Sequence, residues 1–138
     1  MLRYEHILRV RYAETDQMGV VYYGNYAMYF EVARAEMVRS LGFSYSEMER
    51  RHRTMMPVLE LNVNYKKPAR YDEDLRIVTE VRSFPTIRMT FDHEVYNPQN
   101  ELLTTGYVTL VFVDTETMRP RRPPQALLQI LQHHWSPG

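Results

Sequence analysis

Residues 12–39 read YAETDQMGVVYYGNYAMYFEVARAEMVR, and the spacing of their apolar side chains changes partway along. Residues 12–19 show no sustained periodicity and end at a glycine, which is typical of a loop. From Asn25 onward, apolar residues recur every three or four positions, along one face of a helix. This face consists of Tyr26, Phe30, Ala33, Met37 and Leu41. The stretch therefore predicts a loop and then a long helix, with Asn25 as its N-cap and Gly42 just past its end.

Alternating apolar and polar residues, the pattern of β-strands, lie on both sides of this helix. Residues 3–11 alternate before it, and a second, short helix is expected to open at the Ser44-to-Glu47 capping box and run toward His52. Residues 102–113 are apolar on both faces, as a strand covered on both sides should be. Three further strands are predicted, each with one mainly apolar face. The residues of these faces are Leu59, Leu61, Val63 and Tyr65 in the first strand, Leu75, Ile77, Thr79 and Val81 in the second, and Ile87, Met89, Phe91, His93 and Val95 in the third.

This order of elements predicts an α+β fold in a single domain over residues 1–138. The joins between the later strands are short and rich in proline and asparagine, which favours antiparallel hairpins. The one long helix must then cover the apolar face of the one sheet, so we expect a curved antiparallel sheet wrapped around one long central helix. Burial of the helix stripe would contribute ~25 cal/mol per Å² of apolar surface. A chain of this length leaves no room for a second domain.

Composition excludes several classes of partner and chemistry. The 17 basic residues balance the 17 acidic ones, so no global field favours nucleic acid or an anionic membrane. Cysteine is absent, and residues 1–6 carry charges where a signal peptide needs an apolar run. No apolar stretch approaches membrane-spanning length. We therefore expect a cytoplasmic protein with no membrane span.

Common cofactor and metal signatures are also missing. The five glycines form no phosphate-binding loop or dinucleotide fingerprint, and the five histidines show no metal-ligand spacing. We expect no metal site and no cofactor.

Residues 12–39 resemble the corresponding segment of the 4-hydroxybenzoyl-CoA and YbgC-like acyl-CoA thioesterases of the hotdog superfamily. The resemblance continues in the turn YKKPARYDED at 65–74, in Thr105-Gly106, and in Asp114 before a proline-rich exit. It implies the hotdog fold and hydrolysis of a small or medium acyl-CoA or aryl-CoA, with acyl carrier protein as another possible carrier. It further implies a homodimer or homotetramer with the site at the subunit interface.

The resemblance also implies roles for individual residues. Asp16 matches the essential loop carboxylate of the family, Asn25 matches the asparagine at the helix start, and Glu31 belongs to the matching E-x-A-R stretch. YbgC-like enzymes usually have histidine where this chain has Tyr23, whereas the bacterial hydroxybenzoyl-CoA enzymes have tyrosine. The implied role of Tyr23 is therefore that of its backbone N–H, as an oxyanion donor.

Elementary chemistry supports one carboxylate as sufficient for this reaction. A thioester releases a thiolate of pKa about 8.5, which departs without a strong general acid. Asp16 would either attack the carbonyl carbon or activate a water molecule, and the sequence leaves both routes open. Free N–H groups at the helix start would polarise the carbonyl, and Gly24 would let the backbone approach the substrate.

Each candidate also has a purely structural interpretation. An aspartate in such a loop is by itself usually a turn residue, and Glu31 would simply complement the helix dipole. Glu31 is a second candidate carboxylate, because another branch of hotdog enzymes uses one on the helix. Tyr22 could line the acyl pocket or pack in the core. Phosphates of coenzyme A would be bound first by Arg88 and by the Arg121-Arg122 pair, although strand-face cations also protect sheet edges.

A rival hypothesis from a different class is a non-catalytic module that binds acyl-CoA or acyl carrier protein. It predicts tight binding of the thioester without release of thiol. A hotdog dehydratase is a third possibility, but the chain has no matching catalytic histidine motif.

Overall fold

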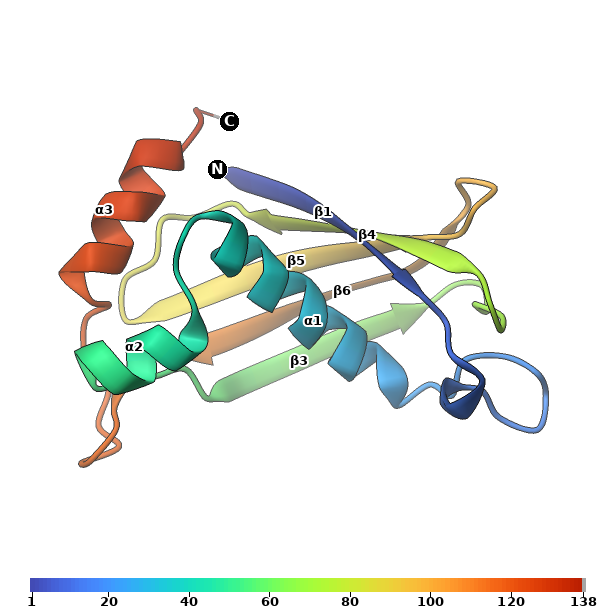
Figure 1. Ribbon diagram of the computed structural model, residues 1–138, viewed down its shortest axis with the longest axis horizontal. Coiled ribbons are helices and arrows are strands. Elements are labelled where there is room, and N and C mark those ends of the chain that lie inside the picture. The colour runs from blue at the N-terminus through green and yellow to red at the C-terminus, as the bar shows by residue number, and fades with distance from the viewer. Residues whose placement is uncertain (138) are drawn as a thin grey trace.

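The computed structural model describes residues 1–137 and contains a five-stranded antiparallel sheet with one long helix across its concave face (Figure 1). The strand order is β1-β4-β5-β6-β3, and every neighbouring pair is antiparallel. The strands are β1 (Leu2–Arg9), β3 (Val58–Tyr65), β4 (Asp74–Val81), β5 (Arg88–Tyr96) and β6 (Leu102–Val111). A separate two-stranded sheet pairs β2 (Thr54–Met55) with β7 (Val113–Asp114). The predicted α+β layout is confirmed.

The helices are α1 (Asn25–Ser40), α2 (Tyr45–His52) and α3 (Gln125–His134), preceded by a 3-10 turn over Tyr12–Glu14. Helix α1 buries Tyr26, Phe30, Ala33 and Met37 of the predicted stripe, together with Tyr29 and Val38. Gly42 follows α1 with φ +88°, a left-handed conformation that glycine adopts without strain. The Ser44 hydroxyl accepts the Glu47 N–H at the start of α2, as its sequence predicts.

The N-cap of α1 differs from the prediction. Gly24 occupies that position and Asn25 is the first helical residue. The Asn25 side chain donates from Nδ2 to the carbonyl oxygen of Glu14 at 2.8 Å instead of accepting a helix N–H. A long-range tie to the preceding loop has therefore replaced the local cap.

The centre of the core lies where α1 crosses β5 and β6. The Phe30 ring stacks on His93 at 4.4 Å, and His93 Nδ1 lies 2.9 Å from Thr79 Oγ1. Gly106 pairs with His93 across the strands, and a Cβ there would lie 2.3 Å from the Asn62 carbonyl oxygen and 2.7 Å from Phe30. Burial, reinforced by the charge of Arg34, lowers the pKa of His93 from 6.5 to about 3, so this histidine is neutral.

Two strand predictions need correction in detail. Strand β3 has a register shift between Val58 and Glu60, which takes Leu59 out of the alternation predicted for it. Strand β5 begins at Arg88, so Ile87 lies outside it and is exposed. The remaining apolar positions of β3 and β5 face α1 as predicted, because they oppose inward residues of β6.

The two edges of the main sheet have different surfaces. The outer edge strand β1 exposes Arg3, Glu5 and Arg9, which form ion pairs along it. The opposite edge strand, β3, pairs on one side only, with β6, and leaves four apolar side chains exposed. These are Val58, Leu59, Leu61 and Tyr65.

The ends of the sheet are also distinct (Figure 1). The loop between β1 and α1 lies where β3 ends and β4 begins, and it bridges to that turn through Val20 and Arg70. Helices α2 and α3 lie at the other end. Among residues 1–137, no helix is long and apolar enough to cross a membrane.

Candidate active site

The base of the loop between β1 and α1 is built around the buried carboxylate of Glu14. Its Oε1 accepts the Arg11 N–H and the Tyr29 hydroxyl, each at 2.9 Å, and its Oε2 lies 2.7 Å from the Arg11 guanidinium. The Glu14 carbonyl oxygen accepts the Tyr22 N–H and the Asn25 side chain. Burial alone would raise the pKa of Glu14, but these donors and the Arg11 charge outweigh it and lower the pKa.

Glu14 was not singled out from the sequence. The available signal was the three-residue spacing of Arg11 and Glu14, which suits a salt bridge across one turn. The partners that make Glu14 important, Tyr29 and Asn25, become neighbours only when α1 folds back on the loop.

Asp16 occupies the tip of the same loop. Its N–H donates to the Val20 carbonyl oxygen, and its own carbonyl accepts the Gly19 N–H at 3.0 Å. Gly19 has φ +78°, which makes glycine the favoured residue at this turn. Within residues 1–137 the half-buried Asp16 carboxylate accepts a single hydrogen bond, from the Met18 N–H at 2.9 Å, and forms no ion pair. Most of its hydrogen-bonding capacity is therefore available to a ligand.

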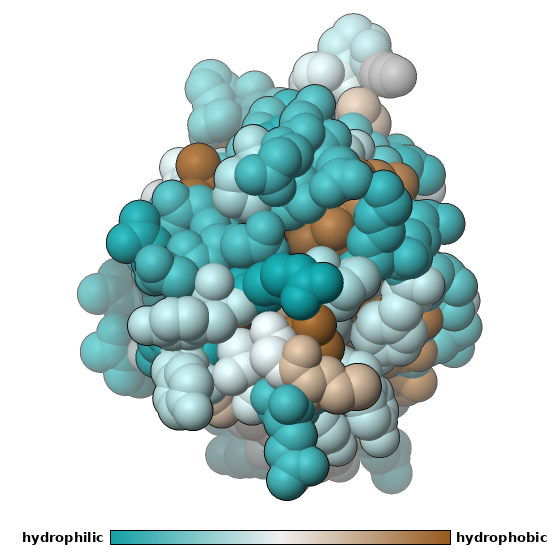
Figure 2. Space-filling model, turned by 90° about the vertical axis from the view of Figure 1, so that its right-hand side faces the viewer, coloured by the Kyte–Doolittle hydropathy of each residue, from teal (hydrophilic) through white to brown (hydrophobic). Residues whose placement is uncertain are grey.

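A cavity of about 680 Å³ opens beside Asp16. Its wall includes Tyr12 and Tyr71, whose rings meet edge to face at 5.7 Å. The remaining lining residues are Ala13, Thr15, Gln17 and Gly19. Figure 2 views the molecule from this end and shows a mainly hydrophilic surface with small apolar areas recessed in its hollows.

The start of α1 presents backbone N–H groups without partners. The Asn25 N–H donates to the Tyr22 carbonyl at 2.9 Å, and the Tyr65 hydroxyl donates to the Tyr23 carbonyl at 3.2 Å. These bonds fix two successive peptide planes, whose N–H groups point away from their bonded carbonyls. Within residues 1–137 the N–H groups of Tyr23 and Gly24 have no hydrogen-bond acceptor. Free N–H groups of this kind can donate to an oxygen that gains negative charge.

A smaller cavity of about 270 Å³ adjoins this helix start. Its aromatic wall is formed by Tyr23, Tyr26 and Tyr65, with Lys66 and Lys67 at its border. The Tyr22 ring lies 4.6 Å from that of Tyr23, and a Cβ on Gly24 would lie 2.7 Å from the Tyr22 ring. Tyr22 is exposed here, whereas Tyr26 belongs to the core as its sequence spacing suggests.

The structure brings together part of the predicted site. A bridge between Thr15 and Val21 folds the loop so that the segment of Asp16 runs beside the segment leading into Tyr22, Tyr23, Gly24 and Asn25. Glu31 lies further along α1, where it is exposed and borders a different cavity, together with Arg34.

The three predicted phosphate ligands lie away from Asp16 in a single chain. Arg88 begins β5 opposite Val111, at the end of the sheet remote from the loop. The Arg121 guanidinium lies 3.6 Å from Asp114 and 3.4 Å from the His52 carbonyl, at the same remote end, and Arg122 follows it. Only a second chain could bring these arginines near an Asp16 carboxylate.

Comparison with known proteins identifies the family. The thioesterase superfamily model matches residues 18–104. The chain is 38% identical to a putative acyl-CoA thioesterase YneP of Bacillus subtilis, over 82% of this chain and 81% of that protein. It is 36% identical to the acyl-CoA thioester hydrolase YbgC of Escherichia coli, over 88% and 90%.

A solved structure gives the same result for the fold. The DHNA-CoA thioesterase of Staphylococcus aureus superposes with a TM-score of 0.84 at 43% identity, covering 88% of this chain and 81% of that one. The sheet curved around α1 is the hotdog fold that the sequence resemblance implies. This chain therefore belongs to the thioesterase superfamily and is a thioester hydrolase of the hotdog fold.

Proposed function

We propose that the protein hydrolyses a small or medium acyl-CoA or aryl-CoA, with Asp16 as the reacting carboxylate. The observation that carries the proposal is a half-buried carboxylate with a single hydrogen bond, in a loop that folds back toward free N–H groups at a helix start. The relatives named as acyl-CoA thioesterases support coenzyme A as the carrier. Acyl carrier protein is the alternative carrier.

Two chemical routes fit Asp16. In the first, an Asp16 oxygen attacks the thioester carbon, the coenzyme A thiolate leaves, and water cleaves the resulting anhydride. In the second, Asp16 takes a proton from water while that water attacks the carbon, and the coenzyme A thiolate then leaves as the carbonyl re-forms. In both routes the N–H of Tyr23, aided by that of Gly24, would stabilise the oxyanion. Incorporation of ¹⁸O into Asp16 during a single turnover in H₂¹⁸O would establish the first route, since water attack at the Asp16 carbonyl of the anhydride labels that carboxylate.

The site is completed, in this proposal, by a second copy of the chain. A two-fold pairing of β3 with its copy would cover the exposed Val58, Leu59, Leu61 and Tyr65 and satisfy the free strand edge. Antiparallel strands place opposite ends side by side, so the partner's arginine-bearing end would approach this chain's loop. Arg88, Arg121 and Arg122 would then bind the coenzyme A phosphates across the interface.

The oligomer is tested with edge variants. Leu61→Lys places a charge in the proposed interface, and sedimentation should show dissociation of the dimer or tetramer into monomers. Ile7→Lys on β1 is the matched control, because Ile7 is 63% exposed on the opposite edge. Equal assembly of both variants and the wild type would contradict pairing through β3.

The absence of cysteine supports the cytoplasm as the proposed compartment.

Hydrolysis is tested by following thiol release from a panel of acyl-CoA and aryl-CoA esters and their acyl carrier protein counterparts. We expect release by the wild type and none above background by Asp16→Asn. The matched control is Asp72→Asn, since Asp72 is exposed and its φ of +69° suits asparagine equally well. Tight thioester binding without thiol release by the wild type would favour the non-catalytic binding module instead.

A further inference from the structure

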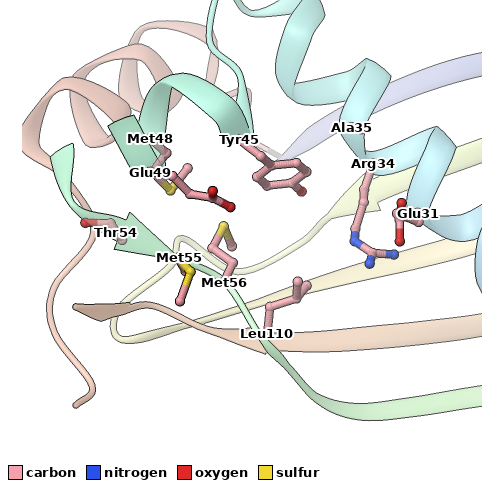
Figure 3. Close-up of a pocket in the computed structure, with 10 residues that line it drawn as sticks. All are labelled: Glu31, Arg34, Ala35, Tyr45, Met48, Glu49, Thr54, Met55, Met56 and Leu110. Carbon is pink, nitrogen blue, oxygen red and sulfur yellow. The ribbon is translucent and has the colours of Figure 1, made fainter. Parts of the chain in front are cut away.

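A cavity of about 230 Å³ lies between α1, α2 and the segment leading into β3, and Asp16 does not line it (Figure 3). Arg34 projects into it from α1 and Tyr45 from the start of α2. Its apolar wall comprises Met48, Met55, Met56 and Leu110. Arg34 is nine residues beyond Asn25, which corresponds to ~13 Å of rise along the helix.

Two nitrogens of the Arg34 guanidinium are buried without a hydrogen-bond acceptor in the described part of the chain. The residue is 6% exposed, and neither Nε nor Nη1 has a hydrogen-bond acceptor within residues 1–137. Burial lowers the pKa of Arg34, although an arginine still keeps its charge at neutral pH. A buried cation whose N–H groups are unsatisfied is unfavourable, so it favours any ligand that supplies acceptor oxygens.

Tyr45 adds a second unpaired polar group to this cavity. Its buried hydroxyl has no hydrogen-bond partner in the described chain, and in Figure 3 it points to the side where Arg34 lies. Burial raises the pKa of Tyr45 to about 12, so the group is a neutral hydroxyl able to donate a hydrogen bond. Arg34 and Tyr45 together offer donors to a ligand with two acceptor oxygens.

The surroundings limit what such a ligand can be. Glu31 and Glu49 line the cavity and are exposed, so they would repel a polyanion such as the phosphates of coenzyme A. The volume is below the ~300 Å³ at which pockets for drug-sized ligands begin. Methionine side chains adapt to ligands of varied shape. These features fit a small acid with one carboxylate and an apolar body.

We propose that this cavity binds a small organic monocarboxylate, whose oxygens are held by Arg34 and Tyr45 and whose apolar part contacts the methionines. If the protein hydrolyses acyl thioesters, as proposed above, this ligand is of the same chemical class as the acid that it releases. The cavity would then let that acid bind a surface of the chain that does not include Asp16. Binding itself does not require the Asp16 chemistry.

The test measures binding of hexanoate to the full-length protein by calorimetry or by chemical shift changes. We expect saturable binding to the wild type, at least tenfold weaker binding to Arg34→Met, and roughly fivefold weaker binding to Tyr45→Phe, which loses only the hydroxyl. Arg50→Met removes an exposed arginine of α2 and should bind as the wild type does. Hexanol, which lacks the carboxylate, should bind at least tenfold more weakly than hexanoate.

The proposal is overturned if hexanoate fails to bind, if hexanol binds equally well, or if Arg34→Met and Tyr45→Phe both bind like the wild type. Should Arg34→Met not fold, Tyr45→Phe alone decides between these results. A wild type that binds hexanoate yet releases no thiol would contradict the proposed function and leave this site standing.

Discussion

The base and the tip of the loop between β1 and α1 each carry a carboxylate, and the two differ in every surrounding contact. At the base, Glu14 is buried and accepts hydrogen bonds from Arg11 and Tyr29. At the tip, two residues later, Asp16 is half-buried with one backbone donor. The comparison teaches that a carboxylate whose hydrogen bonds are satisfied within the chain stabilises the fold, whereas one with free hydrogen-bonding capacity can still bind a ligand.

The largest expected effect comes from the tip. Asp16→Asn removes the reacting charge and keeps the shape of the turn, so kcat/KM should fall by roughly 10²–10⁴-fold. Its melting temperature should stay close to that of the wild type, because Asp16 makes a single side-chain hydrogen bond. Thiol release and thermal unfolding measure the two quantities. A substantial loss of stability in Asp16→Asn would contradict the view that Glu14, and not Asp16, stabilises the loop.

Substitution of Glu14 at the base of the loop should mainly lower stability. Glu14→Ala leaves the buried Tyr29 hydroxyl and the Arg11 N–H without their acceptor and should lower the free energy of unfolding by about 2–3 kcal/mol. Denaturant titration measures this loss. Glu49→Ala, an exposed carboxylate on α2, is the control and should change stability by less than about 0.5 kcal/mol. A Glu14→Ala protein as stable as this control would remove the structural role assigned to the base.

The stability of the protein should also depend on pH, because some groups have a different pKa in the folded and unfolded states. Because the folded pKa of Glu14 is lowered, its stabilisation is present above the unfolded value near 4.3 and is lost as pH falls through the folded pKa. His93, with its pKa lowered to about 3, takes up a proton on unfolding and weakens the fold already below pH 6.5. The slope from one such proton is at most about 1.4 kcal/mol per pH unit.

Denaturation measured from pH 7 to pH 3 separates these contributions. Glu14→Gln should lose less stability than the wild type below pH ~4.5 and follow the same slope between pH 5 and 6.5. His93→Gln should flatten the slope in that upper window. Identical curves for Glu14→Gln and the wild type below pH ~4.5 would show that Glu14 is not linked to folding.

The smallest expected effect concerns the peptide between Tyr23 and Gly24 at the start of α1. Tyr65→Phe removes the hydroxyl that fixes the Tyr23 carbonyl, a bond worth about 1 kcal/mol, so kcat should fall about fivefold with little change in KM. Steady-state kinetics on a thioester measures both. Tyr4→Phe on β1 is the control, because within residues 1–137 the Tyr4 hydroxyl donates no hydrogen bond and Tyr4 lines neither cavity beside the loop. A change in KM alone would assign Tyr65 to substrate binding instead of positioning.

Local patterns were sufficient to predict most of the fold. The three-and-four spacing from Tyr26 to Met37 and the alternation from Leu75 to Val95 depend on which face of each element meets the core. The N-cap of α1 and the bulge in β3 could not be predicted this way. The first depends on a bond between Asn25 and the loop, and the second on the register against β6.

The residues of the candidate site also fall into those predictable from local sequence and those that depend on long-range contacts. Asp16 and Tyr23 were predicted because one continuous segment carries the family motif, and Gly24 because a glycine at the helix start lets the backbone approach a substrate. Glu14 and Tyr65 were not, since the hydroxyl that binds the Glu14 carboxylate lies 15 residues away and the carbonyl that Tyr65 binds lies 42 residues away. The unsatisfied guanidinium of Arg34 is likewise visible only once α2 has packed beside α1.

The sequence by itself determined the order of elements and the buried stripe of α1, because both follow from short-range spacing. The carboxylate expected to react was predicted from the resemblance of one continuous segment to a known family. Tertiary structure alone decided that the Glu14 carboxylate accepts hydrogen bonds within the chain and that the N–H groups of Tyr23 and Gly24 have no acceptor among residues 1–137. Such outcomes depend on hydrogen bonds between residues distant in the chain, and a donor is satisfied or left free only when the whole chain has closed around it.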